Sequence, residues 1–170
     1  LDDLLDAKDV SDLGKMLNSL DTRRGCIAQA MVFCIDRSRC AGAVIAQILF
    51  SVKNWPTDCD GGTQHLSLLF LISDILCNSG NAGVPRASTY RMRLERVLPA
   101  LFQFLGLRYR KIDVCMTAHK VAVATEGVLA AWSRAAVFSA DFLAALRAEI
   151  FDKRETTVQV LQTTEKSVRD

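Results

Sequence analysis

The sequence contains no apolar run close to the roughly 20 residues that a helix needs to cross a bilayer, so we expect no membrane-spanning segment. It also has no glycine-rich phosphate loop, no Gly-x-Ser-x-Gly nucleophile elbow and no Cys-x-x-Cys pair. Each absence removes a familiar arrangement of catalytic or metal-binding residues. We therefore expect a protein that is not an enzyme, holds no metal or cofactor and does not bind membranes.

Six cysteines are present, but their spacing indicates no metal site; they lie at positions 26, 34, 40, 59, 77 and 115. A chain of 170 residues, half of them apolar, can bury a core without disulfides. We therefore expect free, mostly buried thiols and a reducing compartment, the cytosol or the nucleus. The chain begins with Leu1 rather than methionine, so we expect a piece of a longer protein.

Apolar residues recur at helical spacing along most of the chain, and alternation with a period of two is sustained nowhere, which predicts an all-α fold. Helices are expected within 13–20, 27–35, 44–52, 64–79, 94–105, 116–134 and 142–150. The segment 27–35 is apolar almost all round, so we expect it to be buried on most sides. We expect one domain, 1–151, followed by a polar tail, 152–170, that is helical or disordered.

Local signals predict where several of these helices begin or break. Ser11 or Asp12 is a candidate N-cap of the first helix, and Ser139 is the candidate cap of the last. Pro99 stands inside an otherwise regular helical pattern, so a kink or a break is expected just before it. Trp132 continues an apolar face and is expected in the core, whereas Tyr90 is expected to pack with a solvated hydroxyl.

Polar residues form a stripe on the densely apolar segment 64–79. At about 100° per residue, Ser67, Asp74 and Asn78 fall within about 40° of one another on a helix. An unpaired buried carboxylate is costly, so Asp74 must meet water or a partner. The stripe is therefore either the floor of a ligand-binding groove or a set of side chains that cap a neighbouring helix or face solvent.

Short pieces of sequence carry a resemblance to a known family. They are Ala30-Met31-Val32-Phe33-Cys34, Leu71-Ile72-Ser73-Asp74-Ile75-Leu76, Asn78-Ser79, Ala87-Ser88, Tyr90-Arg91, Tyr109-Arg110 and Ala131-Trp132. In this order and spacing they resemble the CTD-interacting domain (CID) of the U2 snRNP-associated SURP-motif splicing factor family, from about Ser11 to Phe151. The resemblance implies a right-handed superhelix of about eight helices, related to ENTH and VHS domains. It also implies a nuclear protein that acts in mRNA processing.

The resemblance also implies a ligand and the residues that bind it. Members of the family bind the heptad-repeat tail of RNA polymerase II, usually phosphorylated, between their second, fourth and seventh helices. Ser73, Asp74 and Asn78 match positions that hydrogen-bond the tyrosine and the backbone of the peptide. The arginines that many members use for phosphoserine are replaced here by Gly127 and Ala135.

Four other cations are therefore the phosphate-binding candidates: Arg23, Arg24, Lys120 and Arg91. Each could equally be a solvated surface charge, and the preferred phosphoserine stays open. Spliceosomal proteins are expected to be partners of the parent chain. From Arg86 to Lys111 there are seven basic residues and one acid, a net charge of +6, which permits auxiliary RNA binding. The main alternative is a protein or lipid scaffold of related fold.

Overall fold

The computed structural model describes residues 4–55, 62–81 and 87–152, and this part of the chain is built from helices alone. The elements are α1 (Ala7–Asn18), α2 (Arg24–Asp36), the short 3-10 helix η1 (Ser38–Cys40), α3 (Ala41–Lys53), α4 (Thr63–Ser79), α5 (Ala87–Tyr109), α6 (Cys115–Arg134) and α7 (Ala140–Phe151). The all-α prediction is confirmed. The described residues contain seven α-helices and one 3-10 helix, close to the eight helices that the resemblance implies.

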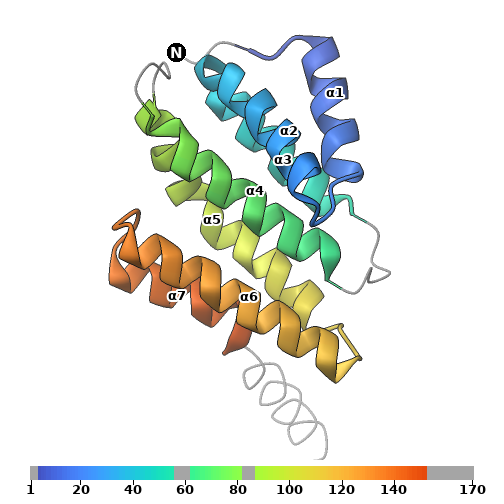
Figure 1. Ribbon diagram of the computed structural model, residues 1–170, viewed down its shortest axis with the longest axis vertical. Coiled ribbons are helices and arrows are strands. Elements are labelled where there is room, and N and C mark those ends of the chain that lie inside the picture. The colour runs from blue at the N-terminus through green and yellow to red at the C-terminus, as the bar shows by residue number, and fades with distance from the viewer. Residues whose placement is uncertain (1–3, 56–61, 82–86, 153–170) are drawn as a thin grey trace, which may run out of the picture.

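The helices after α1 alternate between two layers (Figure 1). One layer holds α2, α4 and α6, and the layer behind it holds α3, α5 and α7. Within the layers α4 packs against both α2 and α6, and α5 packs against both α3 and α7. This arrangement fits the predicted all-α superhelix, and it places α4 between α2 and α6.

Apolar side chains from both layers form one core, whose largest fully buried side chains include Trp132, Tyr90 and Phe102. Trp132 is 1% exposed, as predicted. Tyr90 differs from the prediction, because its hydroxyl is buried and donates to the carbonyl oxygen of Cys34. This hydrogen bond connects α5 to the end of α2. It also gives the buried hydroxyl a partner in place of water.

The first helix begins earlier than predicted. Asp6 is its N-cap, since the Asp6 carboxylate accepts from the backbone N–H of Asp9 at 2.7 Å. Ser11 and Asp12 lie inside α1, so neither of them caps it. The prediction for the last helix is confirmed, because the Ser139 hydroxyl oxygen accepts from the backbone N–H of Phe142.

A single helix, α5, runs through Pro99, so the break considered for this position does not occur. Pro99 lies on the exposed side of the helix, where water can satisfy the backbone carbonyl that loses its partner. Leu98, Leu101 and Phe102 beside it are fully buried and hold both halves of the helix against the core.

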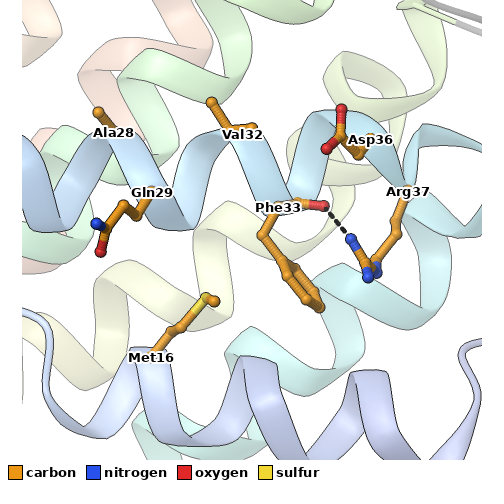
Figure 2. A pocket seen from close by; sticks show the side chains of 7 residues that line it. All are labelled: Met16, Ala28, Gln29, Val32, Phe33, Asp36 and Arg37. Carbon is orange, nitrogen blue, oxygen red and sulfur yellow. Dashed lines mark hydrogen bonds between the residues drawn. The ribbon is translucent and has the colours of Figure 1, made fainter.

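α1 and α2 form an antiparallel hairpin whose open end is tied by Arg37. The Arg37 side chain donates to the carboxylate of Asp9 at 2.6 Å. Its Nη1 donates to the carbonyl oxygen of Phe33 at 3.4 Å (Figure 2). The guanidinium also stacks on the Phe33 ring, 3.6 Å from its centroid. Hydrogen bonding to Arg37 lowers the pKa of Asp9.

Several predictions fall on residues outside the described ranges: the tail from 153 onward, Cys59 and Arg86. None of the described helices is both long and apolar enough to cross a membrane.

Candidate functional site

One strip of α4 reaches the surface between α2 and α6. It consists of Phe70, Ser73, Asp74, Cys77 and Asn78, of which Cys77 is exposed and the others are partly buried. These residues are three or four apart, so they lie on one side of the helix. The remaining sides are closed because α2, α5 and α6 all pack against α4. The strip therefore presents polar groups on an otherwise buried helix.

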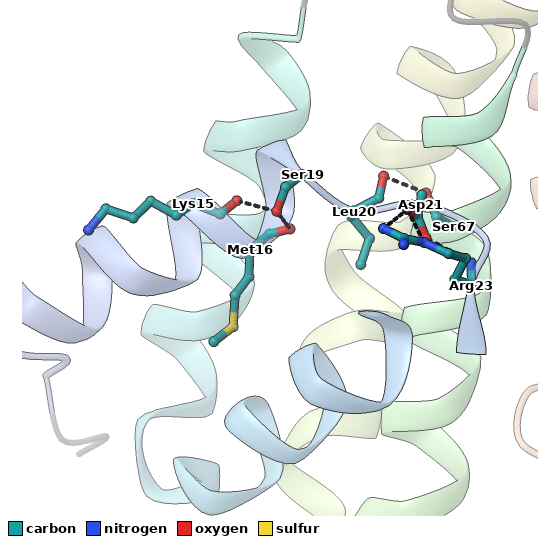
Figure 3. Close-up of polar contacts among 7 residues, drawn as sticks. All are labelled: Lys15, Met16, Ser19, Leu20, Asp21, Arg23 and Ser67. Atoms are coloured by element: carbon teal, nitrogen blue, oxygen red, sulfur yellow. Dashed lines mark hydrogen bonds and ion pairs between the residues drawn. The ribbon is translucent and has the colours of Figure 1, made fainter. Parts of the chain in front are cut away.

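Ser67 was expected to share this strip but lies inside the protein. It is 0% exposed, and its hydroxyl donates to the carbonyl oxygen of Thr63 at 2.7 Å. The carbonyl oxygen of Leu20, in the α1–α2 connection, lies 3.5 Å from the same hydroxyl (Figure 3). The connection between α1 and α2 thus covers this turn of α4, and the expected ligand-facing stripe is shorter than predicted.

Asp74 is the carboxylate of the strip, and no hydrogen bond or ion pair joins it to another of the described residues. Partial burial raises the pKa of Asp74, while the nearby positive charge of Arg24 opposes this shift. A desolvated carboxylate without a donor gains more from a new hydrogen bond than a fully hydrated one. Asp74 is therefore prepared to accept a donor from a ligand.

Ser73 and Asn78 flank Asp74, and each already makes one hydrogen bond. The indole N–H of Trp132 donates to the Ser73 hydroxyl oxygen at 3.2 Å, which connects α4 to α6. The Asn78 amide donates to the backbone carbonyl of Asp74 at 2.8 Å. The Ser73 hydroxyl still has its own proton to donate, and the Asn78 side chain has a carbonyl oxygen that can accept.

Arg23 and Arg24 are neighbours in sequence but are held differently. The Arg23 side chain donates to the carboxylate of Asp21 at 2.7 Å, and the Arg23 backbone N–H donates to the other Asp21 oxygen at 2.8 Å (Figure 3). These bonds lower the pKa of Asp21 and fix the turn before α2. Arg24 is exposed, has no such partner within the described ranges, and lies near enough to Asp74 to influence its ionisation.

Lys120 lies away from the strip, and Arg91 is already engaged by other residues. Lys120 is on the first half of α6, beside a pocket of about 560 Å³ that Met116 and Val123 also line. It is about 18 Å along the helix from Trp132, at 1.5 Å per residue. Arg91 donates to the carbonyl oxygen of Val137 at 2.9 Å and lies 3.7 Å from the Glu95 carboxylate. Arg24 is therefore the exposed cation near Asp74, whereas Lys120 lies farther along α6 and Arg91 is engaged by Val137 and Glu95.

The two positions that lack the family's arginines are both exposed. Gly127 lies on the outer side of α6, and a Cβ built there meets no atom within 4 Å. Ala135 follows the last residue of α6. Space for a longer side chain is therefore present at position 127.

The sequence reasoning missed Phe70 and Cys77 as members of the strip. Their spacing of four and three residues from Asp74 is a signal that could have identified them. It also overestimated thiol burial: Cys34 is buried, and burial raises its pKa to about 12, but Cys77 and Cys115 are exposed. The described cysteines are free, as predicted. Within the described part of the chain, no three metal-ligating side chains are grouped to hold an ion.

Comparison with known proteins gives relatives but no family model, since no model matches the chain. The chain is 33% identical over 132 residues to Protein RRC1 of Arabidopsis thaliana, a match that covers 78% of this chain. It is 30% identical over 139 residues to Protein RRC1-like of the same organism, covering 82% of this chain. Each match spans 14% of the relative, so the chain corresponds to a small part of these proteins.

Proposed function

We propose that this chain is a non-catalytic, nuclear peptide-binding domain that reads the phosphorylated heptad-repeat tail of RNA polymerase II. Through it, a splicing or RNA-processing factor would be coupled to transcription. The proposal draws on the sequence resemblance to CTD-interacting domains and on the similarity to the RRC1 proteins, of which this chain matches 14%. The all-helical fold is compatible with it.

The observation that carries the proposal is the partly buried Asp74 carboxylate, which lacks a hydrogen-bond donor in the described part of the chain. This carboxylate is partly buried on α4, which packs against both α2 and α6, and no donor from the described residues reaches it. In the proposed complex it accepts the hydroxyl of the heptad tyrosine, while Asn78 and Ser73 bond the peptide backbone nearby. Phe70 offers apolar surface in the same strip for a proline or tyrosine ring.

For phosphate we propose Arg24 as the first contact. Its guanidinium is exposed beside the strip, and a planar guanidinium suits the bidentate recognition of phosphate. Arg23 is the weaker candidate because Asp21 already occupies its donors. Lys120 would require a peptide that extends well beyond the strip, and Arg91 is a weaker candidate because Val137 and Glu95 already engage its side chain.

Anisotropy titrations with labelled heptad peptides, unphosphorylated or phosphorylated at each serine in turn, test the proposal. We expect saturable binding of at least one phospho-form. Asp74→Ala should weaken it by about 1–3 kcal/mol, as for a lost hydrogen bond to a charged group, whereas Asp113→Ala, which removes an exposed acid before α6, should leave it unchanged. The absence of saturable binding for every phospho-form at high micromolar concentration would refute the function.

Arg24 is tested in the same assay. Arg24→Ala should weaken the phosphorylated peptide by several-fold and leave the unphosphorylated peptide nearly unaffected, because the lost interaction is with the phosphate. Arg23→Ala is the matched variant, and we expect a smaller effect from it. If both peptides weaken equally with Arg24→Ala, the phosphate contact lies elsewhere.

The basic segment on α5 gives less support to RNA binding. Arg91 donates to the carbonyl oxygen of Val137, Arg108 to the side chain of Gln64, and Arg110 to the carbonyl oxygens of Glu149 and Ile150. These arginines point to different neighbours and tie helices together. A steep fall of RNA affinity with salt would nevertheless revive this alternative.

A further inference from the structure

One face of α6 is open along most of the length of the helix. Lys120, Ala124, Gly127 and Ala131 are three or four residues apart, so they lie on one side of α6. Lys120 and Gly127 are exposed, and the two alanines between and beyond them are partly buried. A Cβ built on Gly127 meets no atom within 4 Å, so the middle of this face is open. A ligand can therefore lie along α6 from one end of the face to the other.

The two ends of this face lie at different levels of α4. The His65 ring and the Thr125 hydroxyl are in contact, with Nε2 and Oγ1 3.3 Å apart, and Trp132 donates to Ser73 at 3.2 Å. α4 and α6 therefore run side by side in the same direction (Figure 1). Trp132 is level with the strip, whereas Lys120, five residues before Thr125, lies near the start of α4. A ligand that extends from the strip in that direction meets the first half of α6.

A pocket of about 560 Å³ lies on that first half of α6, lined by Met116, Thr117, His119, Lys120, Val123 and Ala124. Met116 and Val123 are 80% and 57% exposed, so apolar surface is open to a ligand. No acid lines the pocket, and no ion pair engages Lys120 within the described ranges. Apolar side chains around an available cation suit a ligand that combines proline or tyrosine rings with a phosphate.

The distance from the strip to this pocket corresponds to less than one heptad of peptide. Lys120 lies about 18 Å along α6 from Trp132, at 1.5 Å per residue. Seven residues span about 22 Å in the polyproline II conformation and at most about 25 Å when fully extended. A peptide whose tyrosine lies at Asp74 can therefore bring its next repeat to the pocket while it follows the face of α6.

We propose that the pocket on the first half of α6 is a second subsite for the heptad-repeat tail, and that it binds the repeat adjacent to the one held at Asp74. This inference rests on the proposed function of the strip. In the complex, Met116 and Val123 pack against a proline or tyrosine ring of the adjacent repeat, and Lys120 pairs with its phosphoserine. Because the peptide itself joins the two subsites, the second contact is intramolecular and strengthens binding.

Labelled peptides of one and of two phosphorylated repeats, titrated with the full chain and followed by anisotropy, test the proposal. A two-repeat peptide gains about twofold from statistics alone, because either repeat can occupy the strip. We expect a gain of at least about tenfold over the one-repeat peptide, with one peptide bound to one domain in sedimentation velocity. The one-repeat peptide is too short to fill both subsites, so it reports on the strip.

Two variants locate the second repeat. Lys120→Glu and Met116→Glu should each lower the affinity of the two-repeat peptide by at least about fivefold and leave that of the one-repeat peptide unchanged. Lys53→Glu and Met92→Glu are the matched controls, since Lys53 is an exposed lysine on α3 and Met92 is 50% exposed on α5. Both controls lie in the other layer and should change neither affinity. All four side chains are exposed, so the fold should persist.

Three results would overturn the second subsite and leave the strip as the binding site. One is a two-repeat peptide that gains no more than about twofold. Another is a larger gain that persists in both Lys120→Glu and Met116→Glu. The third is a complex in which one two-repeat peptide holds two copies of the domain. If neither peptide binds, the proposed function itself fails, and the second subsite fails with it.

Discussion

His65 and Ser67 in the first half of α4 are sealed inside the protein, whereas Ser73, Asp74 and Asn78 in its second half reach the surface. In the first half, His65 and Ser67 are at most 2% exposed and find partners in α6 and in the backbone of their own helix. In the second half, Asp74 has no donor among the described residues. The same helix therefore uses its polar groups for packing at one end and offers them to a ligand at the other.

The largest effect on the free energy of unfolding is expected in the buried half of α4, from the titration of His65. Burial lowers the pKa of His65 to about 3, with a smaller contribution from the charge of Arg108. Below the unfolded-state pKa of about 6.5, the unfolded chain takes up a proton that the folded chain does not. Stability is therefore fully present above pH 6.5 and is lost as the pH falls from 6.5 toward 3.

Urea unfolding at pH 7.5 and pH 4.5 measures this loss. Protonation of the unfolded chain should remove about 2–3 kcal/mol between the two values, at about 1.4 kcal/mol per pH unit below 6.5. His65→Gln keeps a polar group of similar size and serves as the reference. The carboxylates of the chain titrate in both proteins, so the difference between the two losses belongs to His65. An equal loss in both proteins would show that His65 is not the group responsible.

Where the buried half of α4 meets the exposed half, the indole N–H of Trp132 donates a hydrogen bond to Ser73. Ser73→Ala leaves the buried indole N–H without its acceptor, at a cost of about 1–2 kcal/mol in the free energy of unfolding. Ser133→Ala, at an exposed position beside Trp132, should cost less than about 0.5 kcal/mol. Equal effects of the two substitutions would mean that this bond contributes nothing to the packing of α6 on α4.

The exposed half of α4 can be tested further by adding the arginine that many family members carry at position 127. Gly127→Arg places a guanidinium on the exposed side of α6, where there is space for it. We expect about a threefold to tenfold gain in affinity for a phosphorylated heptad peptide, near 1 kcal/mol for a partly exposed charge pair. The unphosphorylated peptide is the control. A gain that is equal for both peptides would place residue 127 outside the phosphate contact.

Much of the fold could be predicted from the sequence, because helical periodicity and caps are local signals. The predicted segment 64–79 differs from α4 by one residue, and Ser139 caps α7 as its sequence indicates. The predicted N-cap of α1 was wrong because Ser11 and Asp12 lie inside the helix, which begins after its N-cap Asp6.

The site was less predictable, because exposure depends on contacts between distant segments. A helical wheel places Ser67 beside Asp74, but only the α1–α2 connection, 47 residues away at Leu20, decides that Ser67 is covered. Arg91 is likewise occupied by a residue 46 positions away, Val137. The pairing of Arg23 with Asp21 is local, and the two-residue spacing could have indicated it.

The most direct test of the open strip is a double-mutant cycle between Asp74→Ala and a heptad peptide whose tyrosine is replaced by phenylalanine. The four affinities give the coupling between the carboxylate and the hydroxyl free of other contributions. The proposed hydrogen bond predicts a coupling of about 1–2 kcal/mol, with little further loss when the second change is added to the first. A coupling of zero, with the two losses simply adding, would contradict the claim that Asp74 holds the tyrosine.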